Sequence, residues 1–224
     1  MHRGFFIKGM KAYIFANGDF PHPNFVQQMI RDDDLLIAAD AGYYHIRQIG
    51  LVPTIVIGDL DSILAEDQDL LLADKIPTIK HPVNKDETDL DLCLRYALEM
   101  DVEEIIVTGA FGGRVDQTLG NMMILDDPKF IGRKVKLEDG ITEAFFIDQG
   151  REIVGKPGDT ISLIPWGVPV TGITTIGLQY PLNVETLFPN QSRGISNRMT
   201  TNLCTIEFDQ GTLFCVHIRN EREE

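Results

Sequence analysis

The sequence has few cysteines and no long apolar run. Its three cysteines lie far apart without CxxC spacing, which argues against a disulfide framework or a zinc cluster and is typical of a reducing compartment. No apolar stretch reaches the roughly 18 residues that a membrane-spanning helix needs. The opening Met1–Ile7 is too short for a signal peptide, so we interpret residues 1–9 as an extension before the first strand. We therefore expect a cytoplasmic protein with no membrane partner.

Basic residues are also scarce. Lys and Arg number 20 against 34 Asp and Glu, which gives a formal net charge of −14. So acidic a chain is not expected to bind nucleic acid or an anionic membrane nonspecifically, although a nucleotide needs only a local site. Hydrophobic residues make up 43% and charged residues 24% of the 224 residues, which excludes a disordered chain and allows one large domain or two small ones.

The first part of the chain alternates short apolar runs with helical patterns. This alternation indicates a mainly parallel, Rossmann-like sheet with helices on both faces, and the nearly uninterrupted apolar runs are typical of strands buried on both sides. The pattern predicts strands at 11–16, 35–39, 54–57, 78–80 and 104–108, and helices at about 22–31, 43–49, 65–73, 86–100 and 114–125.

The pattern changes near residue 133, after which no convincing helix is visible. Gly211-Thr212 predicts a hairpin turn between the last two β-rich runs. Such a series is typical of an antiparallel sandwich or barrel. We therefore predict an α/β domain over 1–130 and an all-β sandwich domain over 131–224. The β-rich runs are 143–147, 151–154, 159–164, 171–175, 203–208 and 212–218.

Acidic residues follow several of the predicted parallel strands. Asp19, Asp40, Asp59 and Asp61 stand at or just past strand ends, where open α/β sheets bind their ligands. A single Asp there is more often a helix cap or a turn former. Several carboxylates on one edge repel one another unless a cation joins them, so the group suggests a divalent metal. Alternate residues of an extended stretch point to the same side, so Asp59 and Asp61 could reach one ion, although D-x-D alone is a weak motif.

Two further segments carry candidate ligands. Four carboxylates fall within the six residues 86–91, which is more than a helix cap needs, and Asp89 is the candidate for a second acidic arm of the metal site. The segment 112–117 reads Gly-Gly-Arg-Val-Asp-Gln between a predicted strand and a helix. Its glycines allow backbone N–H groups to approach a phosphate, and Arg114 offers a planar cationic fork for phosphate oxygens. A Gly-rich turn with a surface salt bridge is the alternative for this segment.

Taken together, these residues resemble the thiamine pyrophosphokinase family. Five segments match in order and spacing and cover almost the whole chain. The resemblance implies transfer of pyrophosphate from ATP to the hydroxyl of thiamine, with magnesium, on an α/β nucleotide-binding domain followed by a β-sandwich, in a homodimer with active sites between subunits. The segments are Ala39-Asp40-Ala41-Gly42, Gly58-Asp59-Leu60-Asp61-Ser62, Asp86-Glu87-Thr88-Asp89, Gly112-Gly113-Arg114-Val115-Asp116-Gln117 and Gly194-Ile195-Ser196-Asn197.

The resemblance also implies roles for individual residues. Asp59, Asp61 and Asp89 would hold Mg²⁺ and the ATP phosphates, Arg114 would bind phosphate, and Asp116 would lie near the reacting hydroxyl. The remaining nucleotide-binding candidates are Asp40, Gly58, Thr88, Gly112, Gly113, Gln117 and Asn121.

For thiamine, the resemblance implies contacts from Ser196 and Asn197 to the aminopyrimidine, although Ser-Asn is also common in turns. Eukaryotic members carry Gln where Lys85 stands, and a Trp that stacks on thiamine where Phe214 stands. Phe214 either stacks on thiamine or belongs to the core, because its neighbours are apolar too. No role is assigned to Lys85 or to Trp166.

Rival interpretations remain at this point. The stretch around Asp59 is superficially similar to the nucleophile strand of a haloacid-dehalogenase-type phosphatase, but there it would open the domain rather than come third. A D-x-D glycosyltransferase would leave Arg114 and Asp116 unexplained. A non-catalytic nucleotide or thiamine sensor on the same fold is the remaining alternative, and only an assay separates it from an enzyme.

Overall fold

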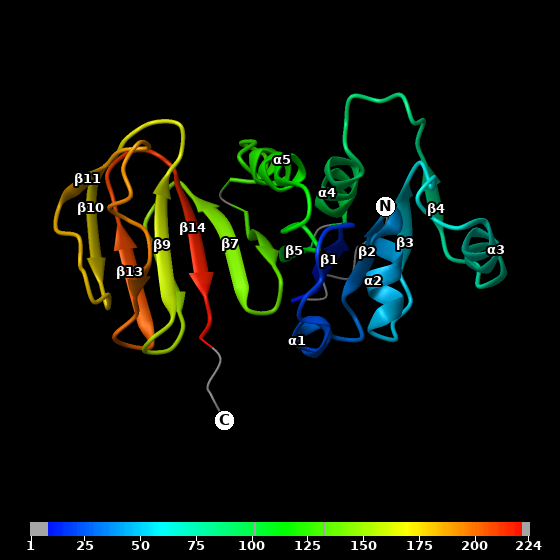
Figure 1. Cartoon of the computed structure of the whole chain (residues 1–224), viewed down its shortest axis with the longest axis horizontal. Coiled ribbons are helices and arrows are strands. Elements are labelled where there is room, and N and C mark those ends of the chain that lie inside the picture. Colours follow the sequence, from blue (N-terminus) through cyan, green and yellow to red (C-terminus); the bar gives the residue numbers. More distant parts are fainter. Residues whose placement is uncertain (1–8, 101, 132, 221–224) are drawn as a thin grey trace, which may run out of the picture. The chain divides into compact units, whose positions relative to one another are not determined.

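The computed structural model describes residues 9–100, 102–131 and 133–220, which form two compact units (Figure 1). The first unit comprises the described residues up to Ile124 together with Leu137–Gly140, and the second comprises Leu125–Lys136 and the chain from Ile141 onward. Within these described ranges, no helix is long and apolar enough to cross a membrane.

The first unit contains a parallel sheet with the strand order β5-β1-β2-β3-β4. Strands β5, β1, β2 and β3 are almost entirely buried because their apolar side chains alternate between two covered faces. Only the edge strand β4 is exposed. The strands are β1 (Lys11–Phe15), β2 (Leu35–Ala39), β3 (Ile55–Gly58), β4 (Thr78–Lys80) and β5 (Glu104–Thr108).

Helices cover both faces of this sheet. On one face, Tyr13 and Phe15 of β1 share a core with apolar residues of the first three helices. On the other face, α4 packs on β1, β2 and β3 with its buried stripe around Cys93. The helices are α1 (Pro23–Met29), α2 (Tyr43–Gln48), α3 (Ala65–Ala73), α4 (Asp89–Glu99) and α5 (Val115–Leu125), with a 3₁₀ turn η1 (Asp40–Gly42) before α2.

The second unit is built from two antiparallel sheets. One has the order β12-β9-β14-β7 and the other β11-β10-β13-β8. One apolar cluster contains residues from both sheets, so the unit is a β-sandwich. The strands are β7 (Thr142–Ile147), β8 (Arg151–Val154), β9 (Thr160–Pro165), β10 (Val170–Ile176), β11 (Glu185–Leu187), β12 (Asn197–Arg198), β13 (Leu203–Glu207) and β14 (Leu213–Ile218).

The predicted fold class is confirmed, but three details of the prediction differ. Strands β13 and β14 lie in different sheets, so the predicted hairpin at Gly211-Thr212 is wrong and this turn instead carries the chain from one sheet to the other. Helix α4 begins three residues later than predicted because Thr88 caps it. Strand β6 (Val135–Glu138) was not predicted, and neither were the short strands β11 and β12. The extension 1–9 lies almost entirely outside the described residues.

Candidate active site

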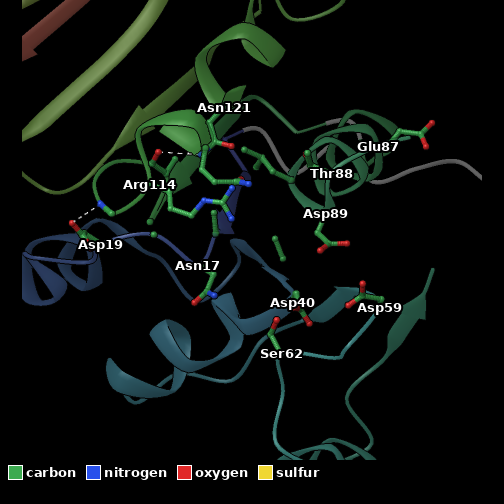
Figure 2. Close-up of a pocket in the computed structure, with 18 of the residues that line it drawn as sticks. Asn17, Asp19, Asp40, Asp59, Ser62, Glu87, Thr88, Asp89, Arg114 and Asn121 are labelled. Carbon is green, nitrogen blue, oxygen red and sulfur yellow. Dashed lines mark hydrogen bonds between the residues drawn. The ribbon is translucent and has the colours of Figure 1, made fainter. Parts of the chain in front are cut away.

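The first unit holds a pocket of about 670 Å³ at the carboxyl ends of its parallel strands. Its lining comes from the loops that follow β1, β2, β3 and β5 and from the segment that leads into α4 (Figure 2). This is the position that the sheet topology predicts for a ligand. Of the candidate residues, the pocket is lined by Asp40, Asp59, Thr88, Asp89, Gly112, Gly113, Arg114, Gln117 and Asn121.

Three carboxylates meet in this pocket. Each of Asp40, Asp59 and Asp89 offers one oxygen, and these oxygens all lie within 4.8 Å of one another. Figure 2 shows the three side chains converging from η1, the loop after β3 and the start of α4. The structure thus joins three elements that are far apart in the sequence into one acidic group.

Gly58 makes room for this group. It has a φ of 156°, and a Cβ at this position would lie 3.0 Å from Cβ of Asp40 and 3.3 Å from Cγ of Asp89. A side chain here would force these two neighbours to shift by a few tenths of an ångström, and it would also be strained by the positive φ. Gly58 therefore leaves room for two of the converging carboxylates, and its predicted contact with the nucleotide stays a prediction.

Asp40 is the most buried member of the group. Its side-chain atom Oδ1 is buried without a hydrogen-bond partner, and the residue is 7% exposed. Burial raises the pKa of Asp40, the nearby Ser62 hydroxyl opposes this rise, and the charges of Asp89, Asp59 and Asp61 add to it. An unpaired buried oxygen beside two more carboxylates is a donor set that suits Mg²⁺, which prefers oxygen ligands.

The predicted metal ligands were Asp59, Asp61 and Asp89, and the structure brings Asp40 rather than Asp61 into the converging group. Asp61 is exposed, its backbone N–H donates to Asp59 Oδ1 over 3.1 Å, and its carboxylate accepts from the Ser62 hydroxyl. Its role as a ligand stays a prediction. Asp40 was expected to bind the nucleotide, and that assignment also stays a prediction.

Lys85 places a cation against the acidic group. Its Nζ lies 2.7 Å from Asp89 Oδ1, and its side chain is only 12% exposed. Burial lowers the pKa of Lys85, but the hydrogen bond and charge of Asp89, together with the charges of Asp59 and Asp40, raise it above its ordinary value. The ammonium is therefore charged at neutral pH.

The glycine-rich loop before α5 is closed by an internal acceptor. The backbone N–H of Gly113 donates to Asp19 Oδ2 over 3.1 Å (Figure 2). Gly112 has a φ of 76°, and a Cβ there would lie 2.0 Å from the same oxygen. Only glycine fits this turn, because the Asp19 carboxylate approaches its backbone so closely. The predicted approach of a phosphate to these glycines stays a prediction.

Arg114 and Asp116 pair with each other at the start of α5. The guanidinium donates from Nε to Oδ1 over 3.1 Å and from Nη2 to Oδ2 over 2.5 Å. Both side chains are largely exposed, at 72% and 65%. Hydrogen bonding from Arg114 lowers the pKa of Asp116. Farther along α5, Asn121 donates from Nδ2 to the Ala110 carbonyl at 3.1 Å.

In the second unit, Asn197 already uses its amide internally. It is 7% exposed, its Nδ2 donates to the Tyr180 carbonyl over 2.7 Å, and its Oδ1 accepts from the Tyr180 N–H over 3.0 Å. Asn197 thus fixes the backbone of Tyr180, whose side chain is 57% exposed. Ser196 is exposed, with a φ of 58°, and its N–H donates to Ser162 Oγ.

Phe214 is buried in the second unit, as the alternative assignment expected, although it does not belong to the apolar cluster between the two sheets. It is 2% exposed, and its ring centroid lies 4.8 Å from that of Phe146 and 5.9 Å from that of Trp166. This position does not support stacking on thiamine. Trp166 is partly exposed, and its Nε1 donates to Asp126 Oδ2 over 3.0 Å.

A second acidic cluster lies in the sandwich. His217 is 1% exposed, with Nδ1 2.9 Å from Glu143 Oε1 and Nε2 3.0 Å from Asp159 Oδ2. Lys136 and Arg219 pair with the other Glu143 oxygen at 2.8 and 3.0 Å. Burial raises the pKa of Glu143, but these partners outweigh it and bring the pKa to about 2.

Comparison with known proteins agrees with the resemblance. Residues 26–137 match the family profile described as "Thiamin pyrophosphokinase, catalytic domain", and residues 147–213 match "Thiamin pyrophosphokinase, vitamin B1 binding domain". The chain belongs to the thiamin pyrophosphokinase family. These two matches also confirm the predicted order of an α/β domain followed by a β domain.

Several members of the thiamin pyrophosphokinase family are similar over most of the chain. Thiamine pyrophosphokinase of Bacillus subtilis is 29% identical over 184 residues, which is 81% of this chain and 86% of that protein. Thiamine pyrophosphokinase 2 of Arabidopsis thaliana is 28% identical over 75% of this chain and 66% of its own length. The crystal structure of the Bacillus subtilis protein superposes with a TM-score of 0.84 at 27% identity, covering 94% of this chain and 100% of that one.

Sequence reasoning missed several polar residues of the pocket. Asn17, Ser62 and Glu87 line it, and so does Lys85, to which no role was assigned. Asn17 and Ser62 follow β1 and β3, so their position after a parallel strand was a usable signal. Lys85 lies four residues before Asp89, but that spacing does not reveal where its ammonium points, because the residues before Thr88 are not helical.

Proposed function

We propose that this chain transfers pyrophosphate from ATP to the hydroxyl group of thiamine, giving AMP and thiamine diphosphate. The observation that carries the proposal is the pocket of the first unit. It combines an acidic group containing an unpaired buried oxygen with a glycine-rich loop and Arg114 at the start of a helix. The family membership and the names of the relatives support the same activity.

Mg²⁺ is the expected cofactor, and Asp40, Asp59 and Asp89 would hold it, with Asp61 as a further candidate ligand. The ion supplies neutralisation of phosphate charge and a template for the ATP phosphates. Gly58 keeps the space between Asp40 and Asp89 open, so the two carboxylates can approach a common ligand. Bound cation would also give Asp40 Oδ1 the partner that it lacks.

The residues of the first unit would bind and orient ATP. Arg114 exchanges Asp116 for phosphate oxygens, and the N-terminus of α5 adds its backbone N–H groups and its dipole. We expect further nucleotide contacts from Thr88, Gln117 and Asn121, which line the same pocket.

The reaction itself requires in-line placement. The hydroxyl oxygen of thiamine forms a bond to the β-phosphorus of ATP, and the bond from that phosphorus to the oxygen bridging the α-phosphate breaks. AMP leaves with that oxygen, and the hydroxyl proton is released. Catalysis of this kind depends on positioning and on electrostatic stabilisation of the phosphoryl charge. Asp116, freed from Arg114, would lie near the hydroxyl.

The second unit would supply the contacts to thiamine. Ser196 is exposed. The side chain of the next residue, Asn197, is hydrogen-bonded to the backbone of Tyr180 and so fixes the position of this exposed aromatic residue. Tyr180 is therefore a better candidate than the buried Phe214 for stacking on thiamine. We also infer that the protein is cytoplasmic and forms a homodimer. Sedimentation velocity of the purified protein tests the dimer.

Separation of the reaction products tests the proposed activity. The protein is incubated with ATP, Mg²⁺ and thiamine, and the nucleotides and thiamine esters are separated by chromatography. We expect AMP and thiamine diphosphate in equal amounts, and neither when thiamine monophosphate, which lacks the free hydroxyl, replaces thiamine. Free phosphate or ADP independent of thiamine would indicate a phosphatase or another transferase. Binding of both ligands without turnover would indicate a sensor.

A further inference from the structure

Lys85 stands apart from the other cation of the pocket. Among the described residues that line the pocket, Lys85 and Arg114 carry positive charge. Arg114 is largely exposed and pairs with Asp116, outside the acidic group. Lys85 is nearly buried and bonds directly to Asp89, one of the three converging carboxylates. The acidic group therefore carries a tethered cation of its own.

The geometry gives this cation two opposing effects on ligands. Its Nζ is 2.7 Å from Asp89 Oδ1, and the carboxylate oxygens of the group lie within 4.8 Å of one another, so a cation held by the group would be close to the ammonium. Two like charges at such a distance repel each other strongly in a partly buried site. Phosphate oxygens that enter the same pocket reverse the sign, because they attract both the metal ion and the ammonium.

We propose that Lys85 is a positioning residue that couples metal binding to nucleotide binding, by disfavouring a divalent cation that arrives alone and favouring one that arrives with ATP phosphates. This inference rests on the proposed function, because it takes ATP and Mg²⁺ as the ligands of the pocket.

The coupling is reciprocal. If the nucleotide increases the affinity for the metal by some factor, the metal increases the affinity for the nucleotide by the same factor. A neutral residue at position 85 removes repulsion from the metal-only state and attraction from the state with phosphate. It should therefore tighten metal binding in the absence of nucleotide and shrink the coupling factor at the same time.

Mn²⁺ binding measured by electron paramagnetic resonance tests this. The probes are Mn²⁺ alone and Mn²⁺ with saturating α,β-methylene-ATP, which is resistant because the bond broken in the reaction lies between the α- and β-phosphates. For Lys85→Gln we expect the Kd of Mn²⁺ alone to fall by about tenfold. The factor by which the analogue lowers the Kd of Mn²⁺ should be smaller than in the unchanged protein by about tenfold or more. Lys85→Arg keeps the charge and should keep the coupling of the unchanged protein.

Lys11→Gln is the matched control. Lys11 Nζ lies 2.7 Å from Glu104 Oε2, the same distance as in the Lys85 pair, but this pair sits where β1 and β5 begin. The control removes the same charge and should leave both Mn²⁺ measurements unchanged. If the Kd of Mn²⁺ alone is unchanged or higher in Lys85→Gln, the proposal is overturned. Lys85 then only holds the side chain of Asp89 in place.

The two proposals can fail separately. Binding of Mn²⁺ and the analogue does not require turnover, so the coupling can be found in a protein that makes no thiamine diphosphate. That result would overturn the proposed function alone. Thiamine-dependent AMP formation together with an unaltered Mn²⁺ affinity in Lys85→Gln would overturn the role of Lys85 alone.

Discussion

The two units each gather buried acidic residues, and they treat them in opposite ways. In the first unit, Asp40 has an oxygen without a partner and a raised pKa beside Asp59 and Asp89. In the sandwich, Glu143 and Asp159 hold His217 between them, and both acids have lowered pKa values. A buried carboxylate oxygen therefore lacks a partner in the first unit, whereas the buried carboxylates of the sandwich are paired with His217.

This difference separates a site from a structural network. A buried charge without partners destabilises the protein and persists where a ligand completes it. A buried ion pair with its hydrogen bonds made needs no ligand, and removing one partner leaves an uncompensated buried charge. The two clusters should therefore respond differently to substitution, in activity for the first and in stability for the second.

The largest expected effect is on stability, from Asp159→Asn. Asp159 accepts hydrogen bonds from the Lys156 and Asn220 N–H groups and from His217, so an amide would place a donor against a donor. We expect a loss of about 3–5 kcal/mol in the free energy of unfolding, measured by urea denaturation. The exposed Asp148→Asn in the same unit is the control and should change little. Equal stability of the two variants would contradict the network.

Asp59→Asn should have the converse effect. It removes one charge from the acidic group, so we expect turnover to fall by about 100-fold or more while the melting temperature without Mg²⁺ stays the same or rises. Mg²⁺ should raise the melting temperature of the unchanged protein and not that of the variant. Asp69→Asn on α3 is the exposed control. Near-normal kcat of Asp59→Asn at saturating Mg²⁺ would show that the metal assignment is wrong.

Arg114→Lys tests the exposed Arg114–Asp116 pair, in contrast to the buried His217–Asp159 pair. The Arg114–Asp116 pair is largely exposed, so its loss should leave the melting temperature nearly unchanged. Because lysine keeps the charge but lacks the planar fork, turnover should fall by roughly tenfold. Steady-state kinetics and thermal melting on the same sample provide the measurement. Full activity with lysine would reduce Arg114 to a point charge.

The smallest expected effect is a pH dependence of the sandwich. Burial lowers the pKa of His217, but its bonds to Glu143 and Asp159 outweigh burial and raise it above 6.5. Its contribution to stability is therefore complete below pH 6.5 and declines as the pH rises through the raised pKa. His217→Gln should flatten this decline. The fluorescence of Trp166, the single tryptophan, follows unfolding of the second unit between pH 6 and 9. A decline that persists in the variant would exclude His217 as its source.

The fold class could be predicted because the parallel strands are short apolar runs and the sandwich is rich in turn residues. Strand β6 was missed because Lys136 and Glu138 interrupt its apolar pattern, although Glu138 is fully buried and accepts from the Gly140 N–H. The prediction joined strands β13 and β14 in a hairpin because strands that are neighbours in the sequence usually pair. In the structure they do not pair, since the chain changes sheet between them.

The acidic character of the site could be predicted, but not which oxygens converge. Asp59 and Asp61 are separated by one residue, yet it is Asp40, from another loop, that lies beside Asp59 and Asp89 instead of Asp61. Leu60 between them has a φ of 65°, so the stretch is not extended and the alternation on which the prediction rested does not hold. Contacts over such sequence distances depend on tertiary packing.

The path of the chain between the two units has a practical consequence for dividing the protein. After Ile124 the chain belongs to the second unit up to Lys136, returns to the first for Leu137–Gly140, and leaves again. Leu137 is fully buried, and a Cβ on Gly140 would lie 2.7 Å from Cβ of Phe25 in α1. A fragment that stops at Ile124 therefore lacks part of its own interior, and one that reaches Gly140 carries a stretch of the other unit. Separate expression of the two family domains requires a circularly permuted or re-linked chain rather than a single cut.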